Sequence, residues 1–223
     1  MEIEDFLDRK IEEWIHRESK KLASNIELYS SGLKAKLRQS EFALKKIKEL
    51  IEQDYSGSTS TQDNRFPHDE KIHFFVDTFF AFLNSTFDIC AQIINQKYKL
   101  GKDEKDVNFK NIIQILKTES PQPPLYHIVK KTPKKIFFIN LNKYRHCSLH
   151  RRQIYIETES HSTKGTKGYN VTFSTFSNFI QRVLCDDPFS INPKIKQKRI
   201  VNEYCMDIFN KAINEIKNIA YNI

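Results

Sequence analysis

The chain has 223 residues, of which 39% are hydrophobic and 29% charged, and this length favours one domain over two small ones. Its formal net charge of +8 is compatible with an anionic partner such as nucleic acid or an acidic membrane surface, and equally with a solvated basic face. Four cysteines without a C-x-x-C pair, and no recognisable secretory leader, argue against a disulfide scaffold and predict reduced thiols in a cytoplasmic protein.

The first quarter of the chain has the pattern of amphipathic helix. From Glu4 to about Asp54, apolar residues recur at helical spacing among Lys and Glu, which predicts one long helix or a pair broken near Ser30-Ser31-Gly32. Residues 56–67 are polar and rich in turn formers, so we expect a linker there.

A Phe-rich segment follows, and His68-Asp69-Glu70 can cap a helix that continues to about Tyr98. Its most apolar stretch, residues 74–94, is interrupted by Asp77, Asn84 and Asp88, which a transmembrane helix would not tolerate well. We therefore expect a central, largely buried helix in a soluble protein with no membrane partner.

The remaining chain predicts further helices and one hairpin. Residues 107–118 have the pattern of a short amphipathic helix, ended by the prolines of 120–124, and a second helix should run from about 133 to 151. Residues 153–158 and 169–174 alternate at period two around a turn with Gly165 and Gly168, which predicts a β-hairpin. Residues 176–184 predict a short helix, and 194–220 a closing amphipathic helix. The fold class is therefore mainly α, with one β-hairpin inserted after the helix 133–151.

The basic charge is concentrated in one segment that also carries an Arg-His string. From Lys130 to Gly168 there are ten basic and two acidic residues, a balance equal to the net charge of the whole chain. The string Arg145-His146-Cys147-Ser148-Leu149-His150 lies within it. Arginine stays charged and can hold a phosphate bidentately, while imidazole can take up and release protons near neutral pH. This combination points to phosphate chemistry.

The string matches R-(polar)-x-x-x-H on a helix, with Arg145, the polar His146 and His150. In this the chain resembles the HEPN superfamily, and the hairpin after the motif helix is similar to the Cthe-type branch. The resemblance implies one HEPN-like domain over 1–223, in which the core spans 68–223 and carries the hairpin at about 153–175. The helices of residues 1–55, before the linker, are either part of the core or a decoration.

The resemblance further implies metal-independent endoribonuclease activity without a cofactor, often in a toxin or abortive-infection role. Arg145, His150 and His146 would be the catalytic set, acting through the ribose 2′-OH of RNA. Positions five apart on a helix diverge by roughly 140°, so one Arg and one His converge more easily when two motif helices meet across a two-fold axis. We therefore expect a homodimer.

Two other functions stay open on the sequence alone. The chain could be a non-catalytic HEPN-like module that binds RNA, a nucleotide or a protein, or a helical scaffold whose Arg-His string is accidental. An antitoxin or regulatory protein is a possible partner of such a domain.

Residues around the string have candidate supporting roles. Asn84 and Asp88 either orient Arg145 or a histidine, or belong to a solvated stripe with Asp77 and Asn95. The candidate RNA-binding residues, which alternatively form a solubilising face, are Lys134, Lys135, Lys143, Tyr144, Arg151 and Arg152. His146, Cys147 and His150 lack a second ligand pair at zinc-site spacing, so we expect no metal.

Overall fold

The computed structural model describes residues 2–16, 18–55, 65–119, 123–150, 156–160, 179–185 and 198–223. In this part of the chain the helices are α1 (Glu2–Ile15), α2 (Lys20–Tyr55), α3 (Arg65–Lys97), α4 (Phe109–Thr118), α5 (Pro124–Val129), α6 (Ile136–His150) and α7 (Val201–Asn222). Short 3-10 turns occupy η2 (Glu104–Asp106) and η3 (Thr132–Lys134). The strands are β1 (Ile156–Ser160), β2 (Phe179–Cys185) and β3 (Lys198–Ile200). The fold is therefore mainly helical, as predicted.

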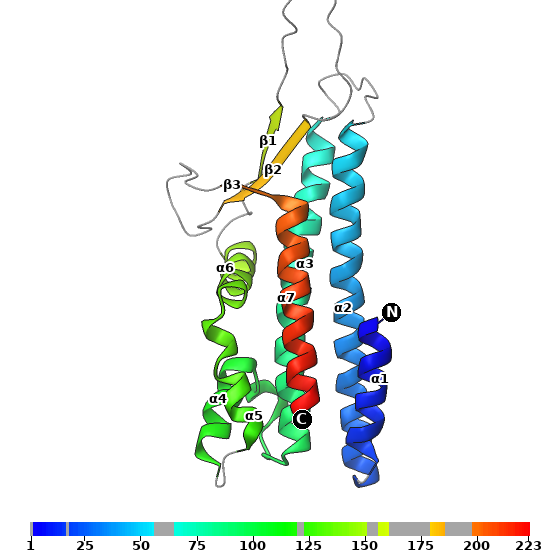
Figure 1. Ribbon diagram of the computed structural model, residues 1–223, viewed down its shortest axis with the longest axis vertical. Coiled ribbons are helices and arrows are strands. Elements are labelled where there is room, and N and C mark those ends of the chain that lie inside the picture. The colour runs from blue at the N-terminus through cyan, green and yellow to red at the C-terminus, as the bar shows by residue number, and fades with distance from the viewer. Residues whose placement is uncertain are drawn as a thin grey trace, which may run out of the picture.

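The bundle is built along α2 and α3, which lie side by side over most of their length (Figure 1). With 36 residues at about 1.5 Å each, α2 is roughly 54 Å long. Helix α7 packs against both, α1 packs against α2 and α7, and α6 packs against α3 and α7. Helices α4 and α5 lie at the end of the bundle away from the strands (Figure 1).

Helix α3 is the centre of the hydrophobic core. Its side chains Phe79, Phe80 and Phe87 are at most 1% exposed, because α2, α4, α6 and α7 cover it from different sides. Among the described residues, one stretch, Glu70–Lys97, is long and apolar enough by composition to cross a membrane. Half of that window is buried inside the bundle, as in the core helix of a soluble protein.

The amino-terminal helix pair is confirmed, but its break lies elsewhere than predicted. The chain leaves helix between Ile15 and Lys20, while α2 runs without interruption through Ser30-Ser31-Gly32. The buried side chains Ile26, Leu33 and Leu37 continue the same apolar face through that point. Packing against α3 therefore outweighs the poor helix propensity of Ser and Gly. Helix α3 also begins earlier than predicted, within the expected linker, whose residues 56–64 lie outside the described part.

Two short elements differ from the sequence predictions. Helix α5 was not predicted, although Pro124 occupies its first turn, where proline fits well. The predicted helix at 176–184 is wrong, because β2 occupies 179–185 and pairs antiparallel with β1, Ile156 facing Leu184. Pairing with a neighbouring strand and the β propensity of Phe179, Ile180 and Val183 favour the extended form.

The hairpin predicted over 153–175 is not observed as such. Its second strand, 169–174, lies outside the described residues, and the described strands form a sheet of order β1-β2-β3. Strand β3 precedes α7, so the closing helix begins at Val201 rather than near Lys194.

The core position of α3 leads to a stability prediction. We expect Phe80→Ala to lower the free energy of unfolding by about 3–5 kcal/mol, since a fully buried aromatic side chain would leave a cavity. The matched control is Phe74→Ala on the same helix, where the side chain is 63% exposed and the loss should stay below about 1 kcal/mol. Urea denaturation of both variants checks this, and equal losses would contradict the assigned core.

Candidate functional site

Helix α6 carries the Arg-His string, and its orientation is set by one buried face. Phe137, Phe138, Leu141 and Tyr144 are at most 7% exposed and recur at the three- and four-residue spacing of one helical side. The ring of Tyr144 stacks on Phe80 of α3, with centroids 4.7 Å apart and planes 20° apart. Its edge also meets Tyr204 of α7 at 5.8 Å. Because Tyr144 is only 1% exposed, it is part of the core and does not fit the prediction that it binds RNA.

A buried polar contact holds the same two helices together. Asn84 of α3 is 4% exposed, and its Nδ2 donates to Oδ1 of Asn142 on α6 at 2.8 Å. Asn142 in turn donates from Nδ2 to the carbonyl oxygen of Phe138 at 3.0 Å. Asn84 therefore does point toward the motif helix, but its partner is Asn142 and not Arg145 or a histidine.

Asp88 has a different role from the one predicted. Its Oδ1 accepts a hydrogen bond from the backbone N–H of Phe109, the first residue of α4, at 3.0 Å. One helical turn further along α3, Gln92 donates to the carbonyl oxygens of Glu104 and Val107 at 2.8 and 3.0 Å. Asn95 donates to the carbonyl of Lys102 at 2.9 Å. Asp88 therefore holds the start of α4, and its described partner is neither Arg145 nor a histidine.

These residues form what we call the α3 polar line: Asn84, Asp88, Gln92 and Asn95. The predicted alternative, a solvated stripe, is also wrong, because Asn84 and Asn95 are no more than 4% exposed. A buried amide needs hydrogen-bond partners, and the loop before α4 and the helix α6 supply them. The polar residues of α3 thus attach the loop before α4 and the helix α6, which carries the Arg-His string.

The start of α6 is tied to α7 through a buried carboxylate. Glu215 is 4% exposed, and it accepts hydrogen bonds from the hydroxyl of Thr132 and from Nζ of Lys135. Thr132 is itself fully buried. Because Lys135 is paired with Glu215, the prediction that it holds an RNA phosphate is not supported by its contacts. Lys134 is exposed and makes no ion pair with any described residue.

The predicted catalytic residues lie toward the end of α6. Arg145 is half-buried and His146 exposed, and Arg145 forms no ion pair within the described part of the chain. Lys143 is half-buried. His150 is the last residue of α6, and its side chain, like Arg151 and Arg152, lies outside the described residues. Within the described part of the chain, no carboxylate therefore occupies the guanidinium of Arg145.

Two apolar side chains that sequence reasoning missed lie on the outer side of α6. Ile136 is 74% exposed and Ile139 is 39% exposed. Their spacing from the exposed His146 keeps all three within roughly 80° around the helix. Isoleucine on the solvent side of a motif helix was a visible signal in the sequence, because it breaks the expected polar pattern.

Glu215, also missed, had a weaker signal. It falls in the buried stripe of α7 beside Ala212, Ile216 and Ile219, where a carboxylate needs a partner. Its partners Thr132 and Lys135 are about 80 residues earlier, so spacing could not identify them.

The thiols in the described part do not offer a reactive or metal-binding centre. Cys90 and Cys205 are buried, and burial raises the pKa of both thiols, that of Cys90 to about 12. No group of three or more His, Cys, Asp and Glu side chains suited to a metal occurs among the described residues. Metal-binding chemistry therefore has no assigned site in this part of the chain.

A mainly helical bundle with R-(polar)-x-x-x-H on one of its helices resembles a HEPN domain. A family model described as Cthe2314-like HEPN matches residues 31–186, which is well over half of the chain. The chain belongs to the HEPN superfamily, and within it to this Cthe2314-like family. The match begins inside α2, includes α3 to α6, and ends just after β2.

Family membership suggests a nuclease, RNA-related or toxin-like role. No curated protein and no solved structure matches the chain.

The contact between Glu215 and the start of α6 can be tested through stability. We expect Glu215→Ala to lower the free energy of unfolding by about 2–4 kcal/mol, because the buried hydroxyl of Thr132 would lose its acceptor and Lys135 its counter-charge. Glu215→Gln should lose less, since its amide oxygen can still accept from Thr132. Urea denaturation beside Glu203→Ala, an exposed position on the same helix, is the measurement. Equal stability of Glu215→Ala and Glu203→Ala would refute the assignment.

Proposed function

We propose that this protein is a metal-independent endoribonuclease of the HEPN type that cleaves RNA by attack of a ribose 2′-OH on the neighbouring phosphate. The observation that carries the proposal is the Arg145–His150 string on α6, inside the segment matched by the HEPN family model. The half-buried guanidinium of Arg145, which has no ion pair with any described residue, and the exposed imidazole of His146 support it.

The chemistry follows from the residue types. A neutral imidazole, assigned here to His150, takes the proton of the 2′-OH, whose oxygen then attacks phosphorus. The bond to the 5′-oxygen breaks as an imidazolium delivers a proton to that leaving oxygen. The guanidinium of Arg145 offsets the negative charge that builds on the phosphate. The products are a 2′,3′-cyclic phosphate and a free 5′-hydroxyl.

We further propose that two copies of the chain build the site together. Tyr144 and Leu141 bind α6 to its own bundle, while the outer side of the same helix presents Ile136, Ile139 and His146. An exposed apolar side beside a catalytic string is suited to pairing with an identical helix across a two-fold axis. Such pairing would bring an Arg and a His from different copies to one phosphate.

The cellular setting is part of the same proposal. We assign the protein to the cytoplasm, with RNA as substrate, in a toxin or abortive-infection role restrained by an antitoxin or regulatory protein. Lys134 and Lys143, near the two ends of the exposed side, are suited to contact the RNA backbone.

Cleavage of RNA in the presence of EDTA tests the activity. We expect the wild-type protein to cut a panel of tRNA and single-stranded RNA and to leave 2′,3′-cyclic phosphate ends. His150→Ala and Arg145→Ala should each slow cleavage by about 10²–10⁴-fold, the range for loss of an acid–base or charge-stabilising group. His127→Ala, an exposed histidine on α5, is the matched control and should retain activity. RNA binding without cleavage would replace the enzyme with a non-catalytic binding module.

The composite site makes a separate prediction. We expect Ile139→Asp to convert a dimer into a monomer and to abolish cleavage together with dimerisation, since a carboxylate would be desolvated at the paired helices. Light scattering after size exclusion and the cleavage assay measure both effects. The control is Leu28→Asp, at a 68% exposed position on α2, which should stay dimeric and active. An active monomer would exclude the composite site.

A further inference from the structure

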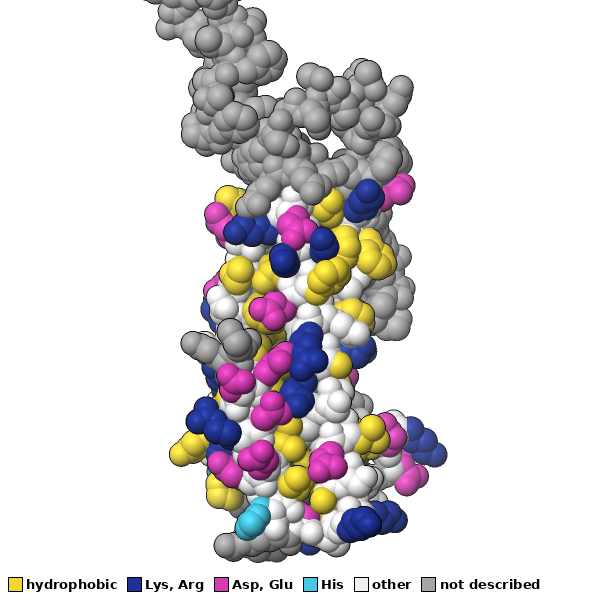
Figure 2. Space-filling view, turned by 90° about the vertical axis from the view of Figure 1, so that its right-hand side faces the viewer, with side chains coloured by type: hydrophobic (Ala, Val, Ile, Leu, Met, Phe, Trp, Pro, Cys, Tyr) yellow, Lys and Arg dark blue, Asp and Glu magenta, His cyan; other side chains and the backbone are white. Residues whose placement is uncertain are grey.

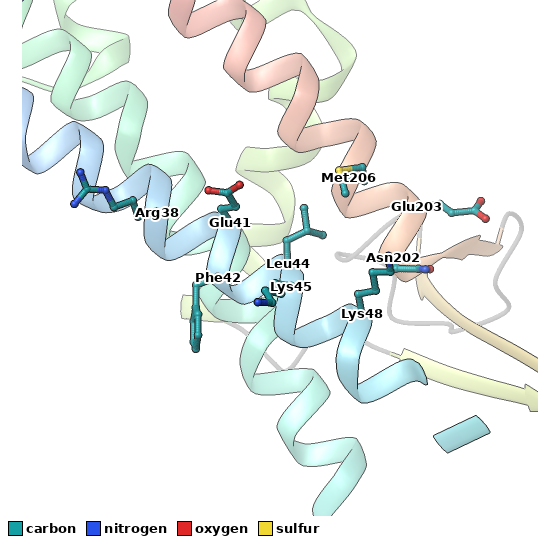
Figure 3. A pocket seen from close by; sticks show the side chains of 9 residues that line it. All are labelled: Arg38, Glu41, Phe42, Leu44, Lys45, Lys48, Asn202, Glu203 and Met206. Atoms are coloured by element: carbon teal, nitrogen blue, oxygen red, sulfur yellow. The ribbon is translucent and has the colours of Figure 1, made fainter. Parts of the chain in front are cut away.

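A groove lies between α2 and α7 at the end of the bundle that carries the strands. It encloses about 590 Å³ and is lined by residues 38–48 of α2 and 202–206 of α7. Leu44, 5% exposed, points from α2 toward α7, and Met206 lines the opposite wall (Figure 3). Met206 is 45% exposed, which is high for a large apolar side chain.

Helix α1 shows what this pair of helices accepts as a partner. It packs against both α2 and α7, and it buries Leu7 and Trp14 to 1% and 3% exposure. Glu4 near its start binds Arg38 of α2 at 2.6 and 3.1 Å, and Asp8 one turn later binds Lys34 at 2.5 Å. Helix α1 is therefore an amphipathic helix held by apolar anchors and by ion pairs along α2.

The groove begins beside the first turn of α1. Arg38, which binds Glu4, is also the first residue of the groove lining, and the lining then continues along α2 away from α1. Figure 1 shows α1 beside only part of α2, and the rest of α2 on that side extends beyond it. One stretch of the α2–α7 surface thus carries a helix, and the next stretch carries none among the described residues.

The unoccupied stretch continues into an exposed aromatic cluster. Phe42 lines the groove and projects from the side of α2 away from α7 (Figure 3). Its ring lies 6.3 Å from Phe75 of α3, which lies 5.2 Å from Phe74. Phe42 and Phe74 are 55% and 63% exposed. Hydrophobic side chains gather on this end of the α2 face, among charged ones (Figure 2). Contiguous apolar surface of this kind marks a site of association.

The charges in the groove indicate which charge a helix bound there should carry. Three cations line the groove, and each has a partner: Arg38 binds Glu4, Lys45 lies 3.9 Å from Glu49, and Lys48 also takes part in an interaction. Glu41 of α2 and Glu203 of α7, both exposed, have no ion pair with any described residue. Carboxylates on both walls of an apolar groove favour a partner with Lys or Arg beside its apolar anchors.

We propose that this groove binds an amphipathic helix of a partner protein, continuing the line of α1, with aliphatic anchors on Leu44 and Met206 and basic side chains facing Glu41 and Glu203. The inference does not depend on RNA cleavage, because none of these residues belongs to α6. It gives the protein a surface through which a second protein can bind while the outer side of α6 stays uncovered.

Two synthetic helical peptides test the proposal against the full chain. They share leucines at the apolar positions of about four helical turns and differ only in carrying Lys or Glu at the polar positions. We expect the Lys peptide to bind at least about tenfold more tightly in fluorescence anisotropy, a difference of about 1.4 kcal/mol. Glu41→Lys combined with Glu203→Lys should reverse the preference, and Met206→Asp should weaken both peptides.

Controls on the same helix separate the groove from general surface effects. Glu27→Lys and Leu28→Asp lie at exposed positions of α2 outside the groove and should leave both affinities unchanged. All variants change exposed residues, and circular dichroism checks that each remains folded. Binding of neither peptide, or a preference that charge reversal does not move, would overturn the proposal. A lower mass of Met206→Asp in light scattering would overturn it as well, because the occupant would then be a second copy of this chain.

Discussion

The stacking of Tyr144 on Phe80 fixes the rotation of α6 about its own axis, and the candidate site depends on that rotation. Successive helical side chains differ by about 100° in direction. With Tyr144 turned into the core, Arg145 falls at the edge of the buried side and His146 on the outer side, and their exposures agree with this. The hydrogen bond between Asn84 and Asn142 fixes the same rotation from a second position. A rotation by one residue would bring the guanidinium of Arg145 into an apolar core, at a high cost in desolvation.

The positive charges at the start of α6 are partly neutralised by α7. Cations near a helix N-terminus oppose the helix dipole, and Lys134 and Lys135 lie directly before Ile136. Glu215 neutralises one of them from the neighbouring helix, so the local field is weaker than the charge of the 130–168 segment suggests. The basic character of this segment therefore has to be judged residue by residue. Lys134 and Arg145 remain unpaired within the described part of the chain, whereas Lys135 does not.

The sequence was sufficient to predict the helical class, the buried Phe-rich helix and the helix that carries Arg145, since each depends on a periodic apolar pattern over many residues. It was insufficient where tertiary packing determines the secondary structure or the hydrogen-bond partner of a residue. The Ser-Ser-Gly triplet stays helical because Leu33 and Leu37 pack on α3, and 179–185 is extended because it pairs with β1. At the site, the position of Asn84 on a helical wheel correctly indicated that it faces α6. The partners of Asp88 and Lys135 lie on α4 and α7, and no local spacing in the sequence identifies them.

The central place of α3 also has a consequence for how the chain is made. The last turn of α7 is synthesised about 125 residues after α3 ends, roughly 6–25 s later at about 5–20 residues per second. During that interval the side of α3 that receives α7 has no partner, and it belongs to the helix whose composition resembles a membrane span. Helix α2 is already present, and α4 and α6 follow before α7 and cover other sides of α3. The nascent chain is therefore exposed to aggregation and to recognition by chaperones or membrane-targeting factors until α7 has emerged from the ribosome.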